Sequence, residues 1–208
     1  MSADTDISPT ADGILEAITR VFAEKGYEGV RVSELAAAAQ VNKATLYYQI
    51  GDKETLYHRV LERLLRRAAD EVAGAVADAG DCESKIRRFI AILARNTGNL
   101  RFTAPIMLRE VAAGGGNLPD AALLQMSRLL GMLGEALDEG VAAGSLRPVN
   151  GFLVHMMIVA TLMLYSSNEP IRRRVAELNP GLAPENLFLS SEALADQVAD
   201  LVLSSIRT

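Results

Sequence analysis

Apolar residues recur at helical spacing along almost the whole chain, and this periodicity constrains the fold more than any other feature. An apolar residue at every third or fourth position gives an α-helix one buried face. Alternation with a period of two, the pattern of a half-buried strand, is absent from the sequence. An all-α fold is therefore predicted, with helices over about 14–25, 32–39, 42–49, 52–79, 83–97, 102–113, 119–143, 151–167, 170–178 and 190–207.

Helix length changes along the chain, and the change predicts a division into two domains. The first three helices are short. Gly26 suits the end of the first, because glycine adopts the left-handed conformation that follows a helix C-terminus. Asn42 and Asp52 are good N-caps for the third and fourth helices. Since the helices are long from Asp52 onward, residues 10–51 are expected to form one domain and residues 52–208 a larger one.

The composition excludes several classes of protein. A net charge of −5 is incompatible with a polybasic coat, but it allows a local contact patch for nucleic acid. Residues 1–9 lack the parts of a signal peptide and are expected to form a disordered tail. The longest apolar stretch, Phe152–Tyr165, is shorter than the about 20 residues of a membrane span, and His155 interrupts it. With a single cysteine, Cys82, no disulfide forms within the chain. We therefore expect a cytoplasmic protein with no membrane partner.

The sequence offers no machinery for catalysis. The two histidines, His58 and His155, have no cysteine cluster beside them, so no metal site is expected. The chain contains no nucleophile elbow, P-loop or dinucleotide fingerprint, and Gly114–Gly116 lacks the preceding strand that a phosphate loop needs. We expect a protein that is not an enzyme and has no cofactor.

The segment 26–56 carries the functional signal. Two short helices, joined at Gln40–Val41 and with Asn42 capping the second, form a helix-turn-helix layout. Side chains near the start of such a second helix reach the major groove of DNA, and the free amides there meet phosphates. A cation, a small residue, hydroxyls and flat rings suit these contacts, and they are supplied here by Lys43, Ala44, Thr45, Tyr47, Tyr48 and, on the next helix, Lys53.

This N-terminal segment resembles the DNA-binding domain of the TetR/AcrR family of bacterial transcriptional regulators. The residues that carry the resemblance are Ile14, Leu15, Phe22, Gly26, Tyr27, Leu35, Ala36, Ala39, Val41, Thr45, Leu46, Tyr47, Lys53, Glu54 and Leu56. The resemblance implies that the third helix reads the groove. It places Lys43, Ala44 and Tyr48 against bases and Thr45, Tyr47 and Lys53 against the backbone. The remaining predicted DNA-binding residues are Arg31, Ser33 and Asn42.

The segment departs from the family pattern at three points. Gln40 stands where a glycine usually makes the turn, so a strained or altered turn geometry is expected there. Gln49 and Ile50 replace a frequent His-Phe pair, although Ile50 still suits the small core. Arg31 stands where a threonine often caps the second helix, and we expect it to contact phosphate instead.

Charge is the main objection to a DNA-binding role. Residues 1–56 contain five cations and nine anions, a net charge of −4. A nonspecific DNA binder would not have this balance, whereas a specific one would if Arg31, Lys43 and Lys53 gather on the groove side. Few phosphate contacts and a modest salt dependence are therefore expected. The alternative is an all-α carrier or sensor that binds a small molecule and does not read DNA.

The resemblance also implies an effector pocket in the larger domain. Adaptable apolar side chains suit such a pocket, and core packing is the alternative role for each of them. The predicted ligand-binding residues are Phe89, Phe102, Met107, Met126, His155 and Met157. Further polar groups that would orient a ligand are Asn96, Arg109, Gln125 and Tyr165.

Two helices are predicted to form a dimer interface. The helix over 151–167 is apolar on nearly all sides, so one protomer is not expected to cover it. The helix over 190–207 presents Leu194, Val198, Leu201 and Ile206, with small residues between them. Paired across a two-fold axis they would form a four-helix bundle, as the resemblance also implies. The expected function is a ligand-responsive repressor that binds a palindromic operator as a homodimer and is released by a small, largely apolar effector.

Overall fold

The computed structural model describes residues 10–99, 102–181 and 187–208, with the side chains of 96–99 left out of the description. Every regular element in these ranges is an α-helix, and Leu146 and Arg207 form one isolated bridge. The all-α prediction is confirmed. The predicted tail, 1–9, lies outside the described residues. The helices are α1 Ala11–Lys25, α2 Val32–Ala38, α3 Lys43–Gln49, α4 Lys53–Ala77, α5 Cys82–Asn99, α6 Thr103–Ala112, α7 Asp120–Ala142, α8 Gly151–Ser167, α9 Glu169–Leu178 and α11 Ser191–Ile206.

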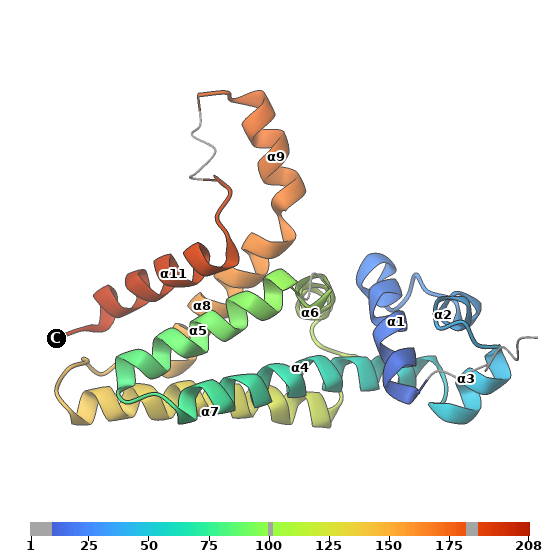
Figure 1. The fold of residues 1–208 in the computed structure, drawn as a ribbon, viewed down its shortest axis with the longest axis horizontal. Helices are drawn as coiled ribbons and strands as arrows, with labels where there is room; N and C mark the ends of the chain where they lie inside the picture. The colour runs from blue at the N-terminus through green and yellow to red at the C-terminus, as the bar shows by residue number, and fades with distance from the viewer. Residues whose placement is uncertain (1–9, 100–101, 182–186) are drawn as a thin grey trace, which may run out of the picture.

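Helices α1, α2 and α3 gather at one end of the molecule (Figure 1). Helix α1 begins where the Thr10 hydroxyl accepts a hydrogen bond from the Gly13 amide at 3.2 Å, and it ends at Gly26, whose φ is 72°. The helices surround a small core in which Ile14, Phe22, Leu35 and Leu46 have no exposed surface. The glycine stop predicted for the first helix is therefore present.

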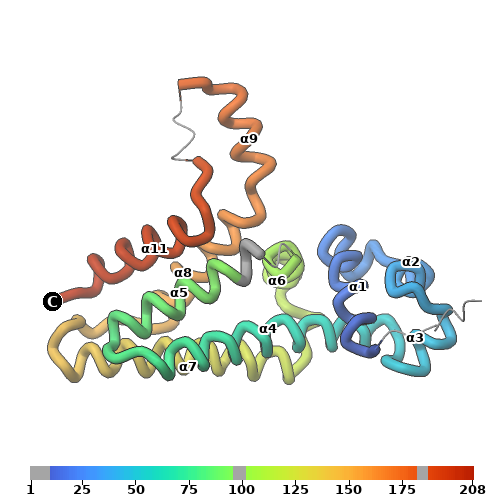
Figure 2. Tube along the Cα trace, viewed as in Figure 1, coloured from blue at the N-terminus to red at the C-terminus, as the bar shows by residue number. Residues whose placement is uncertain are grey.

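Helix α4 connects the two parts of the molecule (Figure 2). Its first half packs into the core of α1–α3 through Leu56 and Val60, and its second half packs into the larger core through Ala69 and Val72. A displacement of α4 would therefore be felt in both cores, because packed interiors transmit strain.

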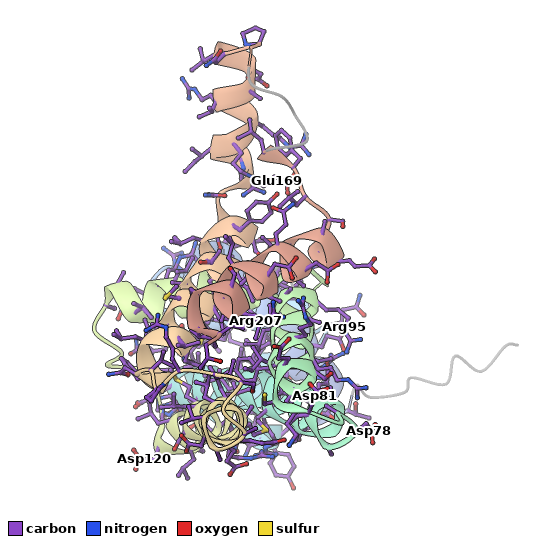
Figure 3. All side chains as sticks on the ribbon, turned by 90° about the vertical axis from the view of Figure 1, so that its left-hand side faces the viewer. Asp78, Asp81, Arg95, Asp120, Glu169 and Arg207 are labelled. Carbon is purple, nitrogen blue, oxygen red and sulfur yellow. The ribbon has the colours of Figure 1, made fainter. Side chains whose placement is uncertain are left out.

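The larger core lies between α4, α5, α7, α8 and α11. Helix α9 buries no residue and projects from the body, with Glu169 at its base (Figure 3). On α7, Leu129 and Leu133 face the core, whereas Leu123 is 45% exposed. In a helix this rich in leucine, several adjacent stripes are apolar, so periodicity leaves the buried face undetermined.

Within the described ranges, no single helix is both long and apolar enough to cross a membrane. Helices α8 and α9 together pass the length and composition test, but the chain bends by 65° between them. The described residues also contain no group of three histidine, cysteine or acidic side chains that would hold a metal ion.

Candidate DNA-binding site and buried cavity

Helix α3 presents one polar face outward because its other face is anchored in the core. Leu46 has no exposed surface and Ile50 is 4% exposed. At its start, the Asn42 side-chain oxygen accepts a hydrogen bond from the Thr45 amide at 2.7 Å, the cap predicted from the sequence. Side chains on the outward face are Lys43, Ala44, Tyr47 and Tyr48, of which Tyr48 is 93% exposed.

The turn between α2 and α3 contains a residue in the left-handed region. Gln40 has a φ of 55° and is the only residue other than glycine with positive φ in the described ranges. The Val41 amide donates to the carbonyl of Ala36, and the Gln40 amide donates to that of Ala37. These two bonds define a Schellman motif, in which glycine normally takes the position of Gln40. Of the two outcomes expected at Gln40, a strained or an altered turn, the structure has the strained one: the turn is the usual glycine type with glutamine at the left-handed position.

A glutamate side chain caps the start of α2. Arg31 precedes the helix and makes no side-chain cap, as expected from its replacement of threonine. Instead, the Glu34 carboxylate accepts a hydrogen bond from the Arg31 backbone amide at 2.8 Å and forms an ion pair with Lys25. The hydrogen bond from Lys25 and that from the Arg31 amide lower the pKa of Glu34. The Arg31 side chain is left exposed, and so is that of Ser33.

Lys53 opens α4 directly after the end of α3. Its ammonium nitrogen lies 4.5 Å from the centre of the Tyr27 ring, within the range of a cation–π contact. The side chain of Asp52 caps the helix by accepting from the Thr55 amide at 2.8 Å. Burial and the negative charge of Glu54 raise the pKa of Tyr27. The ring of Tyr27 therefore positions Lys53 at the end of the molecule that carries α3.

The nine predicted DNA-binding residues come from three adjacent places: the start of α2, helix α3 with its cap, and the first residue of α4. Lys25, a further cation of this domain, is paired with Glu34. No carboxylate in the described part of the chain lies within 4 Å of the charged groups of Arg31 or Lys43. Arg31 and Lys43 are therefore cations available to a ligand at the outer end of the domain. That these residues contact DNA stays a prediction.

A cavity of about 70 Å³ lies in the larger domain, between α4, α5, α6, α7 and α8. Three of the six predicted ligand-binding residues line it, namely Met107, Met126 and His155. The remaining lining residues are Leu64, Leu65, Ala68, Leu93, Thr103, Leu129, Val159, Leu162 and Met163. Thr103 and Met163 were not predicted, because nothing in their local sequence distinguishes them from ordinary core positions.

The other three predicted ligand-binding residues lie elsewhere. Phe89 is buried in the core, and its ring contacts that of His155 edge-on at 6.1 Å. Phe102 lines a separate groove between α1 and α4, where the Arg20 guanidinium lies 5.5 Å from its ring centre. Met157 is 56% exposed on the outer face of α8, so its assignment to an internal pocket is wrong.

Of the four polar groups expected to orient a ligand, none lines the cavity within the described residues. The Tyr165 hydroxyl donates to the carbonyl of Leu187 at 3.0 Å, and Gln125 accepts from Arg128 at 2.6 Å. The side chain of Asn96 lies outside the described residues.

Arg109, the fourth of these groups, binds the end of α1. Its guanidinium donates to the carbonyls of Phe22, at 3.5 Å, Ala23, and Glu24, at 3.1 Å. These are carbonyls of the last turn, which have few partners within their own helix and carry the negative end of its dipole. Arg109 therefore joins α6 to the N-terminal domain.

The next residue, Glu110, makes a second connection to α4. It is 2% exposed, and it accepts a hydrogen bond from the Tyr57 hydroxyl at 2.6 Å and one from Asn117 at 3.2 Å. Burial and the contact with Glu110 raise the pKa of Tyr57, so its hydroxyl stays a donor at all ordinary pH values. Because Thr103 and Met107 of the same helix line the cavity, α6 touches both the cavity and the N-terminal domain.

A helix-turn-helix domain with an outward, capped second helix, joined by one long helix to an α-helical body, is the architecture of a DNA-binding regulator. Residues 14–60 match the family model described as bacterial regulatory proteins, tetR family. The N-terminal part of the chain is therefore similar to the DNA-binding domain of the TetR family of transcriptional regulators.

Two relatives indicate how far the sequence likeness extends. The transcriptional repressor NicS of Pseudomonas putida is 32% identical over 84 residues, which cover 40% of this chain and 40% of NicS. The chain thus matches less than half the length of this relative. The transcriptional regulator RutR of Escherichia coli is 24% identical over 164 residues, which cover 79% of this chain and 77% of RutR.

Solved structures share the fold over nearly the full length. The transcriptional regulator FadR from Bacillus subtilis, solved with stearoyl-CoA, superposes with a TM-score of 0.73 at 19% identity, covering 94% of this chain and 98% of FadR. AibR, solved with isovaleryl coenzyme A and operator DNA, gives a TM-score of 0.65 at 20% identity, covering 91% of this chain and 96% of AibR. At these identities the likeness establishes the fold alone.

Proposed function

We propose that this protein is a ligand-responsive repressor that binds a palindromic operator as a homodimer and leaves it when a small, largely apolar molecule occupies the larger domain. The observation that carries the proposal is helix α3. Its inner face is held by Leu46 and Ile50, its start is capped by Asn42, and it presents Lys43 and Tyr48 outward. Binding to DNA would place the action of the protein in the cytoplasm.

Helix α3 suits the major groove in its chemistry as well as its exposure. Lys43 supplies a charged donor at the tip, and Ala44 allows the backbone to approach a base edge or a thymine methyl. The exposed Arg31 and the positioned Lys53 suit phosphates on either side. With so few cations, recognition would depend on base contacts more than on the release of counterions.

The outer face of α8 supports a homodimer. Its large apolar side chains are about half exposed in one protomer, and they are Phe152, Leu153, Met156, Met157 and Leu164. On α11, by contrast, Leu194, Val198 and Ile206 are buried within the protomer and only Leu201 is exposed, so α8 supplies most of the expected contact. A two-fold axis would place two copies of α3 about 34–36 Å, or a multiple of this distance, apart on DNA.

Helix α6 supports a connection between effector and DNA. It contributes Thr103 and Met107 to the cavity, and through Arg109 and Glu110 it holds α1 and α4. A molecule that enlarges the cavity would displace α6 and with it the N-terminal domain. Release follows if the molecule binds the displaced state more tightly than the DNA-bound state. FadR, solved with stearoyl-CoA, and AibR, solved with isovaleryl coenzyme A and operator DNA, are proteins of similar fold that bind acyl-CoA ligands.

The test is an anisotropy titration with labelled DNA from upstream of the gene. We expect the variant Lys43→Ala/Tyr48→Ala to bind at least about tenfold more weakly than the parent, since a base contact contributes about 1–3 kcal/mol. Both side chains are exposed, so the fold is preserved. Arg128→Ala, which removes one cation from the surface of α7, is the matched control and should bind as the parent does. Equal binding by the parent and the double variant would refute the assignment of α3.

The carrier or sensor alternative is favoured by one observation, the net charge of −4 over residues 1–56. In that case the parent would bind no upstream fragment at low salt, while the cavity would still take up apolar molecules. The same titration therefore separates the two functions.

A further inference from the structure

We propose that the buried cavity is a site for an apolar molecule that carries one neutral hydrogen-bonding group, a hydroxyl or a carbonyl, and that Thr103 and His155 recognise this group. The assignment of such a molecule as the effector rests on the proposed function; the binding site itself does not.

Two buried polar atoms without protein partners carry the inference. The Thr103 hydroxyl and the His155 Nε2 atom have no accessible surface and no hydrogen-bond partner within the described structure. The residues are 8% and 9% exposed, and both line the same cavity, Thr103 from α6 and His155 from α8, which pack against each other. Buried polar groups are nearly always paired, and leaving one unpaired costs about 1–3 kcal/mol. Both residues line the same cavity, so a molecule that enters it and moves the side chains around it can supply the missing partner.

The rest of the cavity wall defines what else the molecule can carry. Every other lining side chain is aliphatic or a methionine, and no charged side chain lines the cavity. A carboxylate or phosphate would therefore be buried without a countercharge, which is strongly unfavourable. Burial lowers the pKa of His155, so its imidazole is neutral at pH 7 and cannot provide that charge. A neutral imidazole and a hydroxyl both donate and accept hydrogen bonds, which suits a hydroxyl or carbonyl group.

The size of the cavity limits the molecule as well. At about 70 Å³ it has roughly half the volume of an engineered cavity of about 150 Å³ that binds benzene. Three of its walls are methionines, Met107, Met126 and Met163, whose unbranched side chains repack at low cost. A compact ring of five carbons with one polar group is therefore a suitable probe, because it requires only a modest movement of these side chains.

The experiment compares three probes that share a five-carbon ring: cyclopentanol, cyclopentane and cyclopentanecarboxylate at pH 7.5. Binding to the full-length protein is followed by ¹³C-methyl NMR of its methionines. We expect cyclopentanol to shift the resonances of Met107, Met126 and Met163 and to leave those of Met156 and Met157, on the outer face of α8, in place. Cyclopentanol should bind at least about tenfold more tightly than cyclopentane, corresponding to one net hydrogen bond, and the carboxylate should cause no shift.

Variants test whether Thr103 and His155 are responsible for this preference. In Thr103→Val/His155→Leu, which keeps similar volumes, the ratio of the two affinities should fall to about one, while cyclopentane binding reports that the variant is folded. Thr161→Val is the control, because that hydroxyl lies on the exposed side of α8 and donates to the Met157 carbonyl. It should keep the preference. Should the double variant fail to fold, Thr103→Val alone must reduce the ratio.

Several outcomes would overturn the proposal. Three of them concern affinity: equal affinities of the parent for cyclopentanol and cyclopentane, tighter binding of the carboxylate than of cyclopentanol, or an unchanged affinity ratio in the variants. The fourth is the absence of any shift at Met107, Met126 and Met163, which would mean that the two polar groups bind only water. Failure of the proposed function looks different. In that case cyclopentanol shifts the cavity methionines, but no molecule bound there changes the affinity for DNA.

Discussion

The hydrogen bond between Tyr57 and Glu110 allows a quantitative prediction, because both groups are almost completely buried. Tyr57 is 1% exposed and Glu110 is 2% exposed, and their oxygens are 2.6 Å apart. Tyr57→Phe removes only the hydroxyl and keeps the ring, which packs against the rings of Phe22 and Tyr27 at 4.8 and 5.0 Å. The substitution therefore isolates one contact between α4 and α6.

The expected loss follows from what Glu110 retains. Without Tyr57, its carboxyl group keeps only the contacts with the Asn117 amide, at 3.2 and 3.4 Å. A buried hydrogen bond to a carboxyl group contributes about 1.5–3 kcal/mol. We expect the free energy of unfolding to fall by about 2 kcal/mol, which corresponds to a roughly 30-fold change in the unfolding equilibrium.

Urea unfolding followed by circular dichroism measures this loss. Tyr48→Phe is the matched control, since it makes the same chemical change at a side chain that is 93% exposed, and its effect should stay within about 0.5 kcal/mol. Amide hydrogen exchange should also accelerate in α6 and in the first turns of α4. A loss below about 0.5 kcal/mol for Tyr57→Phe, or equal losses for both variants, would refute the argument that this contact joins the two helices.

Four further predictions follow from the structure, each tested by urea unfolding. Arg109→Met should lower the free energy of unfolding by about 1 kcal/mol, a modest loss because the residue is exposed to solvent. An unchanged free energy would mean that the contact of Arg109 with α1 does not stabilise the fold. Thr103→Val should raise it by about 1 kcal/mol in the absence of ligand, and a decrease would contradict an unpaired hydroxyl. Gln40→Gly should raise it by about 0.5–1 kcal/mol by relieving the positive φ, and a decrease would contradict strain at this turn. Because the pKa of His155 is lowered in the folded state, the unfolded state binds more protons, so stability should decrease as the pH falls below about 6.5, by at most about 1.4 kcal/mol per unit. His155→Leu should remove this part of the slope and His58→Gln should keep it.

The sequence predicts elements whose signals are local. The bounds of α8 and the cap at Asn42 were expected because glycine, asparagine and helical periodicity act within one or two turns. The buried face of α8 could not be predicted, because a helix that is apolar on all sides has no preferred phase. For this reason Met157 was assigned to the inside although it is exposed, while His155 on the opposite face is buried.

The contacts that join the two parts of the molecule have no local signal at all. Arg109 and the carbonyls that it binds are 85 to 87 residues apart in sequence, and Tyr57 and Glu110 are 53 apart. An arginine or glutamate on a helix normally indicates a solvated face, and only the packing of α6 against α1 and its hydrogen bond to α4 give these two side chains their partners. The unpaired state of the Thr103 hydroxyl is likewise a property of the packed core.

A chemical footprint of the upstream DNA tests the central claim most directly, namely that two copies of α3 read one site together. Guanine N7 methylation and hydroxyl-radical protection should show two symmetric patches, about 10 base pairs or a multiple of one turn apart, on the same face of the duplex. Both patches should disappear together in Lys43→Ala/Tyr48→Ala. A single patch, or protection that survives in this variant, would contradict the account.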